Sequence, residues 1–377
     1  MNILFVSSYY TPYISGLTIY AQRLAEGLVK KNNRIEVITN RHQKDLSFQE
    51  KINGVLVRRV NPLFRLSRGF VSPWLFFLFL KEIGRNQIVV LHLPMPEAFV
   101  FAPLAKIFSR KVFLIYHADL NLPTWSIFSK LIENLVFVNH SVAGLCANKI
   151  VAYSQDYANF SPFLRRFKNK VITNFPPVLM RKPDFETAHK WKEELGLSGN
   201  IIIGFAGRFA EEKGGDILIE SLPFVLKSFP KAKIVFAGEI NLAYEDFYRR
   251  KKDLIEKFKN HLVFLGLVPP EKMPEFFALC DVFVLPSRAE CFGMVQVEAM
   301  LCGCPVVAFN IPGGRVPLSV TGMGKLVEPF NRERLAEAVI EVVKNKKQYL
   351  KSVNKVKNIF SFKRTIINYE KIFLSKN

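Results

Sequence analysis

Five side chains of this 377-residue chain have types and positions suited to chemistry on a charged ligand. Arg208 and Lys213 lie close together in sequence, and a guanidinium and an ammonium can both bind a phosphate group. Two carboxylates, Glu290 and Glu298, are separated by seven residues. His117 directly follows an apolar run that predicts a strand. The two cations indicate a site for an anionic ligand such as a phosphate group.

The segment that carries the two glutamates predicts a strand, a loop, a helix and a second strand. Residues 281–286 and 305–309 are short apolar runs typical of buried strands. Residues 287–293 form a polar loop that holds the first glutamate, and residues 294–302 predict a helix that carries the second. This order is the crossover of a parallel sheet, which binds ligands at the carboxyl ends of its strands. The alternative is a plain crossover helix with one solvated glutamate.

The two cations are expected in a similar position. Residues 201–206 predict a strand, and residues 216–228 predict the helix that follows it. Arg208 and Lys213 therefore fall in one loop, near the amino terminus of a helix, where an anion is favoured. An ordinary basic loop is the other interpretation.

The first half of the chain begins with a comparable unit. Residues 2–8 predict a strand and residues 18–31 a helix, and the loop between them contains Gly16. This order would aim free helix amides at an anion, although a tight turn would explain the glycine equally well. Further strands are predicted at residues 34–39, 54–60, 87–92, 111–116, 149–154 and 170–174.

The amino-acid composition limits the classes of protein to which this chain can belong. Hydrophobic residues make up 49% of the chain, including 35 Phe, which supports sizeable cores and excludes a disordered chain. The five cysteines lack the spacing of a metal site, which favours reduced thiols in a cytoplasmic protein. No signal peptide is expected, because residues 1–7 already read as a strand. The most apolar run, residues 70–80, is shorter than the roughly 20 residues that span a bilayer.

The formal net charge of +21 favours anionic partners or reflects only solvated lysines. Residues 1–180 hold 22 Lys and Arg against 9 Asp and Glu, and residues 181–377 hold 31 against 23. Residues 62–84 mix Arg65, Arg68 and Lys81 with aromatic side chains. This segment predicts a crossover helix beginning at Pro73 that packs on a sheet, or a surface for the lipid interface, and both could hold on different faces.

Two sequence frames together resemble the retaining glycosyltransferases of family 4. One is E-C-F-G-M-V-Q-V-E-A-M-L-C-G-C-P-V-V-A from Glu290, and the other is G-R-x-x-x-x-K-G from Gly207. The resemblance implies the GT-B fold, in which two Rossmann-like domains face each other across a cleft that holds a nucleotide-sugar. Two departures are visible. Ser15-Gly16 replaces a pair of glycines, and the acidic residue expected after Pro312-Gly313-Gly314 is missing.

The resemblance implies transfer of a sugar from a nucleoside-diphosphate donor to an acceptor hydroxyl with retention, as in glycolipid, lipopolysaccharide or cell-surface polysaccharide synthesis. Arg208 and Lys213 would stabilise the leaving diphosphate, and Glu290 would hold sugar hydroxyls. Glu298 would bind the ribose, and His117 would contact the sugar. Other donor-binding positions are implied at Gly16, Phe292, Gly293, Met294 and Val295. No metal ion and no cofactor besides the donor would be required.

The resemblance also implies the division of the chain. We expect an acceptor-binding domain at residues 1–175, a linker at 176–199 after Pro176-Pro177, a donor-binding domain at 200–358, and a terminal helix within 359–377 that packs back on the first domain. The protein would be cytoplasmic, with peripheral contact to an anionic membrane as an option. A phosphorylase or epimerase with the same two-domain frame is one alternative. A non-catalytic polyanion binder is another, although no nucleic-acid-binding module supports it.

Overall fold

The structure is a computed structural model that describes residues 1–66, 69–120, 127–242 and 245–375. Arg68, which the sequence analysis named, lies outside these ranges. No helix within the described ranges is long and apolar enough to cross a bilayer.

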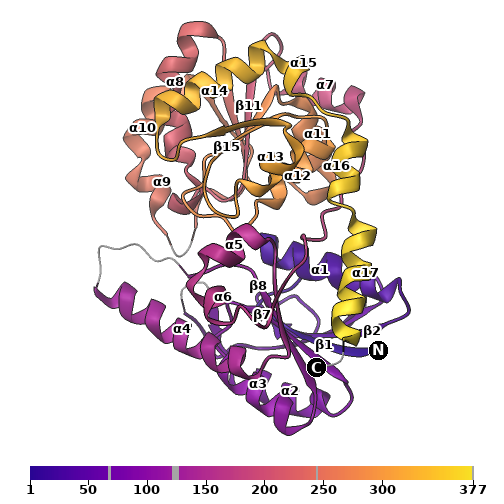
Figure 1. Ribbon diagram of the computed structural model, residues 1–377. Coiled ribbons are helices and arrows are strands. Elements are labelled where there is room, and N and C mark those ends of the chain that lie inside the picture. Colours follow the sequence, from indigo (N-terminus) through magenta and orange to yellow (C-terminus); the bar gives the residue numbers. More distant parts are fainter. Residues whose placement is uncertain (67–68, 121–126, 243–244, 376–377) are drawn as a thin grey trace. The chain divides into compact units, whose positions relative to one another are not determined.

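The chain folds into two compact α/β units (Figure 1). Unit 1 contains residues 1–177 and 362–377, and unit 2 contains residues 178–361. Residues 178–199, which were expected to be a linker, therefore belong to unit 2. The reason is that α7 (Phe185–Glu194) packs against α11 (Met273–Leu279) and buries Ala188.

Unit 1 contains an eight-stranded sheet in the order β10-β9-β8-β7-β1-β2-β4-β3, parallel except where β3 pairs with β4. The central strands are buried along almost their whole length, because helices cover both faces of the sheet. A separate hairpin is formed by β5 (Phe64–Leu66) and β6 (Gly69–Val71). The strands of the main sheet are β1 (Asn2–Val6), β2 (Arg34–Asn40), β3 (Gln49–Ile52), β4 (Val55–Val60), β7 (Ile88–Leu93), β8 (Lys111–Tyr116), β9 (Lys149–Ala152) and β10 (Val171–Thr173).

The helices of unit 1 lie on opposite faces of this sheet. The chain moves from β1 to β2 in one direction and from β4 through β7 and β8 to β9 in the other. Since such crossovers are right-handed, α1 covers one face and α2, α3 and α4 cover the other. Figure 1 shows α2, α3 and α4 along one flank, apart from α1 and α17. The helices are α1 (Gly16–Val29), α2 (Pro73–Ile83), α3 (Ala98–Ile107), α4 (Ile127–Cys146), α5 (Gln155–Phe160), α6 (Pro162–Arg166) and α17 (Phe362–Leu374).

Unit 2 contains a six-stranded parallel sheet in the order β13-β12-β11-β14-β15-β16. Its core gathers apolar residues from β11, α8 and α14 in one cluster. The strands are β11 (Ile202–Ala206), β12 (Lys233–Ala237), β13 (Leu262–Phe264), β14 (Val282–Leu285), β15 (Val306–Phe309) and β16 (Gly324–Val327). The helices besides α7 and α11 are α8 (Gly215–Ser228), α9 (Phe247–Arg250), α10 (Lys252–Phe258), α12 (Met294–Leu301), α13 (Val316–Thr321), α14 (Arg332–Lys344), α15 (Lys346–Tyr349) and α16 (Val353–Ile359).

The terminal helix α17 belongs to unit 1, where it packs beside α1. Phe373 is 1% exposed, and its ring centroid lies 4.9 Å from that of Phe113 in β8. The next residue, Leu374, is 62% exposed. A substitution at Leu374 is therefore a suitable control for one at Phe373.

We expect Phe373→Ala to destabilise unit 1 by about 3–5 kcal/mol, because it removes a buried ring and leaves a cavity. Leu374→Ala should change the free energy of unfolding by less than about 0.5 kcal/mol. Urea titration with hydrogen exchange of the amides in β1, β7 and β8 measures both values. Equal effects of the two substitutions would contradict the packing of α17 described here.

Candidate functional site

The candidate residues of unit 2 gather where the strand order of its sheet reverses. The chain leaves β11 toward β12 on one side and leaves β14 toward β15 on the other, and β11 and β14 are neighbours. In open α/β sheets, ligands bind beyond the carboxyl ends of the strands at such a switch point. Arg208 and Lys213 follow β11, and Glu290 follows β14, so the loops that carry them begin side by side.

The two loops are in direct contact. The ammonium of Lys213 lies 2.8 Å from a carboxylate oxygen of Glu290 and donates a hydrogen bond to it. Gly214 follows with a φ of +70°, and a Cβ at this position would overlap the carbonyl oxygen of Pro286. Glycine is therefore needed to bring the first loop against the end of β14.

The surroundings keep Lys213 charged. Burial alone would lower the pKa of its ammonium, but the carboxylates of Glu290 and Glu212 outweigh burial and raise the pKa above 10.5. Lys213 is therefore a fixed cation near neutral pH and is unsuited to act as a general base.

Arg208 is held on its own loop. Its guanidinium lies 2.8 Å from the carboxylate of Glu212, and both side chains are about a third exposed, at 29% each. This loop begins at Gly207 (φ +148°) and closes with a short 3-10 turn, Glu211–Lys213. A ligand can thus reach Arg208 and Lys213 in the loop after β11, beside the carboxylate of Glu290 in the loop after β14.

A second ion network, missed by the sequence analysis, clamps the two loops together. Arg288 donates two hydrogen bonds to the carboxylate of Asp216, at 2.8 and 2.9 Å, and a third to the carbonyl oxygen of Glu211 at 2.6 Å. Asp216 is 1% exposed and also contacts the ammonium of Lys251 at 2.9 Å. Burial by itself would raise the pKa of Asp216, but the hydrogen bonds from Arg288 and Lys251 lower it below 3.8.

Glycine residues also set the backbone around Glu290. Gly313 has a φ of +76°, and a Cβ there would overlap the carbonyl oxygens of Glu290 and Cys291. Gln296 of α12 donates a hydrogen bond of 2.8 Å to the carbonyl oxygen of Gly314. The turn at 313–314 is therefore fixed to both the loop and the helix, even though the acidic residue expected after it is missing.

The expected donor-binding residues at the start of α12 divide into two groups. Phe292 is fully buried against Phe360, so its side chain belongs to the core of unit 2. Gly293 is the N-cap residue, with a φ of +75°, and Met294 and Val295 form the first turn of the helix. Glu298 lies one turn further along α12 and is half-buried.

In unit 1, Gly16 is the first residue of α1 and is exposed, and the helix begins with a capping box between Ser15 and Thr18. The hydroxyl oxygen of Ser15 accepts from the amide of Thr18 at 3.2 Å, and the Thr18 hydroxyl oxygen accepts from the Ser15 amide at 2.9 Å. Serine in place of a first glycine therefore supplies the cap of this helix.

His117 differs from the expected sugar-facing imidazole. It is 6% exposed, and both of its ring nitrogens are engaged, one 2.9 Å from Nδ1 of His92 and the other with the hydroxyl of Tyr153. Burial, followed by the influence of His92, holds the pKa of His117 well below 6.5. The ring is thus a neutral part of a buried cluster, and a contact with sugar would require it to exchange one of these partners.

Asp119 does not contact His117 through any hydrogen bond of the described residues. It accepts instead from the hydroxyls of Tyr116, Tyr157 and Ser161, at 2.7–2.8 Å. The carboxylate therefore fixes the chain after β8 to α5 and to the start of α6.

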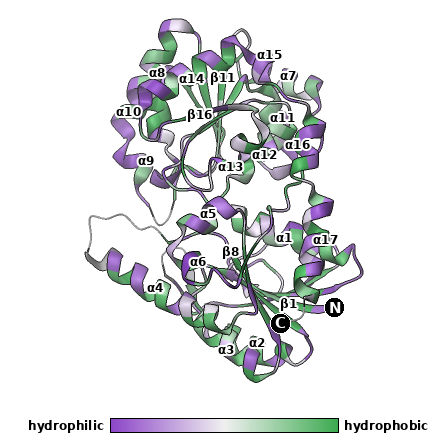
Figure 2. Ribbon diagram, viewed as in Figure 1, coloured by the Kyte–Doolittle hydropathy of each residue, from purple (hydrophilic) through white to green (hydrophobic). Residues whose placement is uncertain are grey.

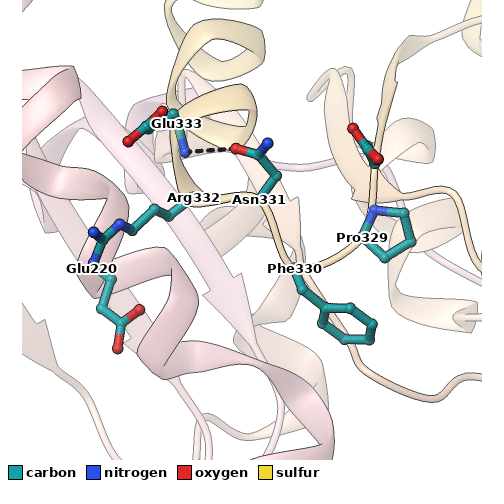
Figure 3. Close-up of a pocket in the computed structure, with 7 residues that line it drawn as sticks. Glu220, Pro329, Phe330, Asn331, Arg332 and Glu333 are labelled. Carbon is teal, nitrogen blue, oxygen red and sulfur yellow. Dashed lines mark hydrogen bonds between the residues drawn. The ribbon is translucent and has the colours of Figure 1, made fainter.

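A separate pocket of unit 2 is lined by Glu220 of α8 and by residues 328–333 after β16 (Figure 3). Its lining holds three carboxylates, those of Glu220, Glu328 and Glu333, and one guanidinium, that of Arg332. This excess of negative charge disfavours a diphosphate, so the switch point remains the better site. Among the described residues, no group of three or more His, Cys, Asp or Glu side chains could hold a metal ion.

Comparison with known proteins agrees with this geometry. A family model described as Glycosyl transferases group 1 matches residues 187–358, and one described as Glycosyltransferase Family 4 matches residues 14–170. An uncharacterized glycosyltransferase of Methanocaldococcus jannaschii is 30% identical over 91% of this chain and 89% of its own length. The alpha-galactosylglucosyldiacylglycerol synthase of Streptococcus pneumoniae is 31% identical over 47% of this chain and 49% of its own.

Solved structures show the same fold. Anabaena Alr3699/HepE, in complex with UDP and glucose, matches all of this chain and all of its own with a TM-score of 0.78 at 19% identity. The expected GT-B architecture, with parallel sheets in two domains, is confirmed by this likeness.

Proposed function

The chain belongs to the group 1 glycosyltransferases of family 4, and we propose that it moves a sugar from a nucleoside-diphosphate donor to an acceptor hydroxyl with retention of the anomeric configuration. The observation that carries the proposal is the contact of Lys213 with Glu290 at the switch point of the sheet of unit 2. It joins a cationic loop suited to a diphosphate with a carboxylate suited to sugar hydroxyls.

The two cations would act on the leaving group. As the bond between the sugar and the diphosphate breaks, negative charge accumulates on the phosphate oxygens. Preorganised positive charge stabilises that change more than it stabilises the intact donor. Arg208 can bind two phosphate oxygens at once, and Lys213 adds a compact charge beside them. In this proposal, side chains offset the charge of the leaving group, and no metal ion is assigned.

The carboxylates would orient the donor. Glu290 would exchange part of its contact with Lys213 for hydroxyls of the transferred sugar when the phosphate reaches the ammonium. Glu298 would bind the ribose, and the backbone from Phe292 to Val295, together with the loop at Gly16, would line the donor. For His117, whose ring is buried, the proposal keeps only a supporting role in shaping the end of β8.

The name of one relative supports a proposal for the class of acceptor. The Streptococcus pneumoniae protein is named for a glycolipid product, and it is 31% identical over about half of this chain. We propose an acceptor of the same broad kind, a lipid-linked or cell-surface glycan. UDP is the first nucleotide to test, because the Anabaena structure holds UDP and glucose.

We expect UDP or another nucleoside diphosphate to raise the melting temperature of the protein in buffer that contains EDTA. Ligand at 100 times its Kd adds about 2.7 kcal/mol to the free energy of unfolding. A thermal-shift screen of UDP, GDP and ADP, with the corresponding monophosphates as controls, measures the effect. The proposal fails if no nucleoside diphosphate stabilises the protein at millimolar concentration.

Release of the nucleotide from the matching donor then separates transfer from other reactions. A glycosyltransferase releases diphosphate faster when acceptor is added, and NMR of the new glycosidic bond reports whether the configuration is retained. An epimerase keeps the nucleotide in its product, so little free diphosphate would accumulate with or without acceptor.

A further inference from the structure

Large apolar side chains are concentrated on one part of the surface of unit 1. Among the described residues, 22 large apolar side chains are exposed, and 12 of these lie between residues 63 and 145, which is 83 of 377 positions. They come from the start of the β5–β6 hairpin and from α2, α3, its C-cap and α4. The twelve are Leu63, Phe64, Trp74, Phe77, Phe99, Ile107, Phe108, Leu131, Ile132, Leu135, Val138 and Leu145.

Helix α4 contributes a continuous stripe. Leu131, Leu135, Val138 and Leu145 follow one another at intervals of four, three and seven residues, so they share one face of the helix. Their exposed fractions range from 54% to 66%. The opposite face is closed, since Ala143 is fully buried and α4 packs along α3. The stripe therefore points away from the core.

Helices α2 and α3 extend this surface. Trp74 and Phe77 of α2 are 57% and 59% exposed, and Phe99 and Ile107 of α3 are 50% and 75% exposed. Right-handed crossovers place all three helices on the same face of the sheet, and α3 contacts both of the others. Figure 2 shows hydrophobic residues on α2 and α3 and repeated hydrophobic bands along α4. Tryptophan and phenylalanine among aliphatic residues are typical of a face that enters a lipid interface.

Positive charge accompanies the apolar residues. Residues 62–149 hold nine Lys and Arg against four Asp and Glu, a net charge of +5. Lys81, Lys106 and Lys130 are exposed on α2, α3 and α4 in turn. Glu82, the acidic residue of α2, is fully buried and paired with Arg58 and Arg85, so it adds little negative charge to this surface.

We propose that the outer faces of α2, α3 and α4 form a docking surface for an anionic lipid bilayer, with the helices in the plane of the interface and the apolar side chains among the headgroups and upper acyl chains. A second copy of this chain is disfavoured as the occupant, because two molecules of net charge +21 repel each other while an anionic bilayer attracts them. The inference rests on unit 1 alone and does not depend on sugar transfer.

The test is co-sedimentation of the full chain with vesicles of phosphatidylcholine, with and without phosphatidylglycerol. We expect binding to the anionic vesicles at low salt and much weaker binding to neutral vesicles or at high salt. Leu135→Gln/Val138→Gln should lower the apparent affinity by at least about tenfold, because two apolar side chains no longer enter the interface. The matched control is Leu179→Gln/Phe185→Gln, which changes side chains of unit 2 that are 52% and 59% exposed.

Three results would overturn the proposal: no binding of the wild type to anionic vesicles at low salt, equal loss in the variant and its control, or equal binding by variant and wild type. Light scattering tests the alternative that a second copy of this chain occupies the surface. A wild-type dimer that ignores vesicles and that Leu135→Gln/Val138→Gln converts to a monomer would identify the surface as a contact between copies. The melting temperature of each variant without ligand, measured on the same samples, shows separately that the variant is folded.

Discussion

Lys213→Ala should reduce turnover by about two to three orders of magnitude, the usual cost of removing one group that stabilises developing charge. The ammonium lies between two loops at the switch point of unit 2, 2.8 Å from Glu290, and its raised pKa keeps it charged throughout the neutral range. Its loss removes a positive charge from the leaving group and also leaves Glu290 as an uncompensated carboxylate that repels phosphate. Turnover is measured as release of nucleoside diphosphate from the donor that the thermal-shift screen identifies.

The controls for this prediction separate charge from fold. Lys227→Ala removes an exposed lysine of α8 and should leave turnover unchanged. Lys213→Ala/Glu290→Gln removes both charges of the pair, and it should restore binding of the diphosphate in part without restoring turnover. Near-normal turnover of Lys213→Ala, at an unchanged melting temperature, would exclude the role proposed for this residue.

The parts of the fold that the sequence predicts well are those in which one strand is buried on both faces. Runs such as Ile202–Ala206 and Ile88–Leu93 are almost entirely apolar and form central parallel strands. Edge elements were missed for the opposite reason. The strand Gln49–Ile52 carries charged and half-exposed residues, and its pairing with Val55–Val60 is antiparallel, so no apolar run marks it.

Helix predictions failed where packing overrides the local pattern. The segment 176–199 looked like a linker because of its prolines, yet Phe185–Glu194 is a helix that packs on α11. Contacts between residues that are distant in the sequence decide this case.

The sequence predicts the candidate site only in part, because some of its contacts join residues that are distant in the sequence. Arg208, Lys213 and Glu290 were predicted from their motifs, and the structure brings Lys213 and Glu290 into contact across 77 positions of sequence. Arg288 lies in the loop after β14 and Asp216 in the first turn of α8, and no local sequence pattern indicates that this buried carboxylate pairs with a guanidinium 72 positions away. The burial of His117 was hidden for a similar reason, because its partner His92 ends a different strand.

Arg288→Ala should destabilise unit 2 by about 2–4 kcal/mol and raise the KM for the donor more than it lowers kcat. The side chain gives two hydrogen bonds to Asp216, which is 1% exposed, and one to the carbonyl oxygen of Glu211. Without it, the buried carboxylate keeps Lys251 as its ion-pair partner among the described residues, and the loop of Glu290 loses the Arg288 side-chain contact with the loop of Lys213. Arg249→Ala, which removes a guanidinium whose side chain is 85% exposed, is the matched control and should cost less than about 0.5 kcal/mol.

The pH dependence of the stability difference between wild type and Arg288→Ala tests whether Arg288 acts through Asp216. The folded-state pKa of Asp216 lies below its ordinary value of 3.8, so its contribution is fully present above that value and is lost as the pH falls through the folded-state pKa. The difference in the free energy of unfolding should therefore be constant near neutral pH and shrink below pH 3.8. In a double-mutant cycle, Arg288→Ala/Asp216→Ala should be more stable than the sum of the single changes, since no buried charge remains unpaired. Additive effects and a difference that does not vary with pH would mean that the two side chains act independently, and Arg288 would then have to position the loop through the carbonyl oxygen of Glu211 alone.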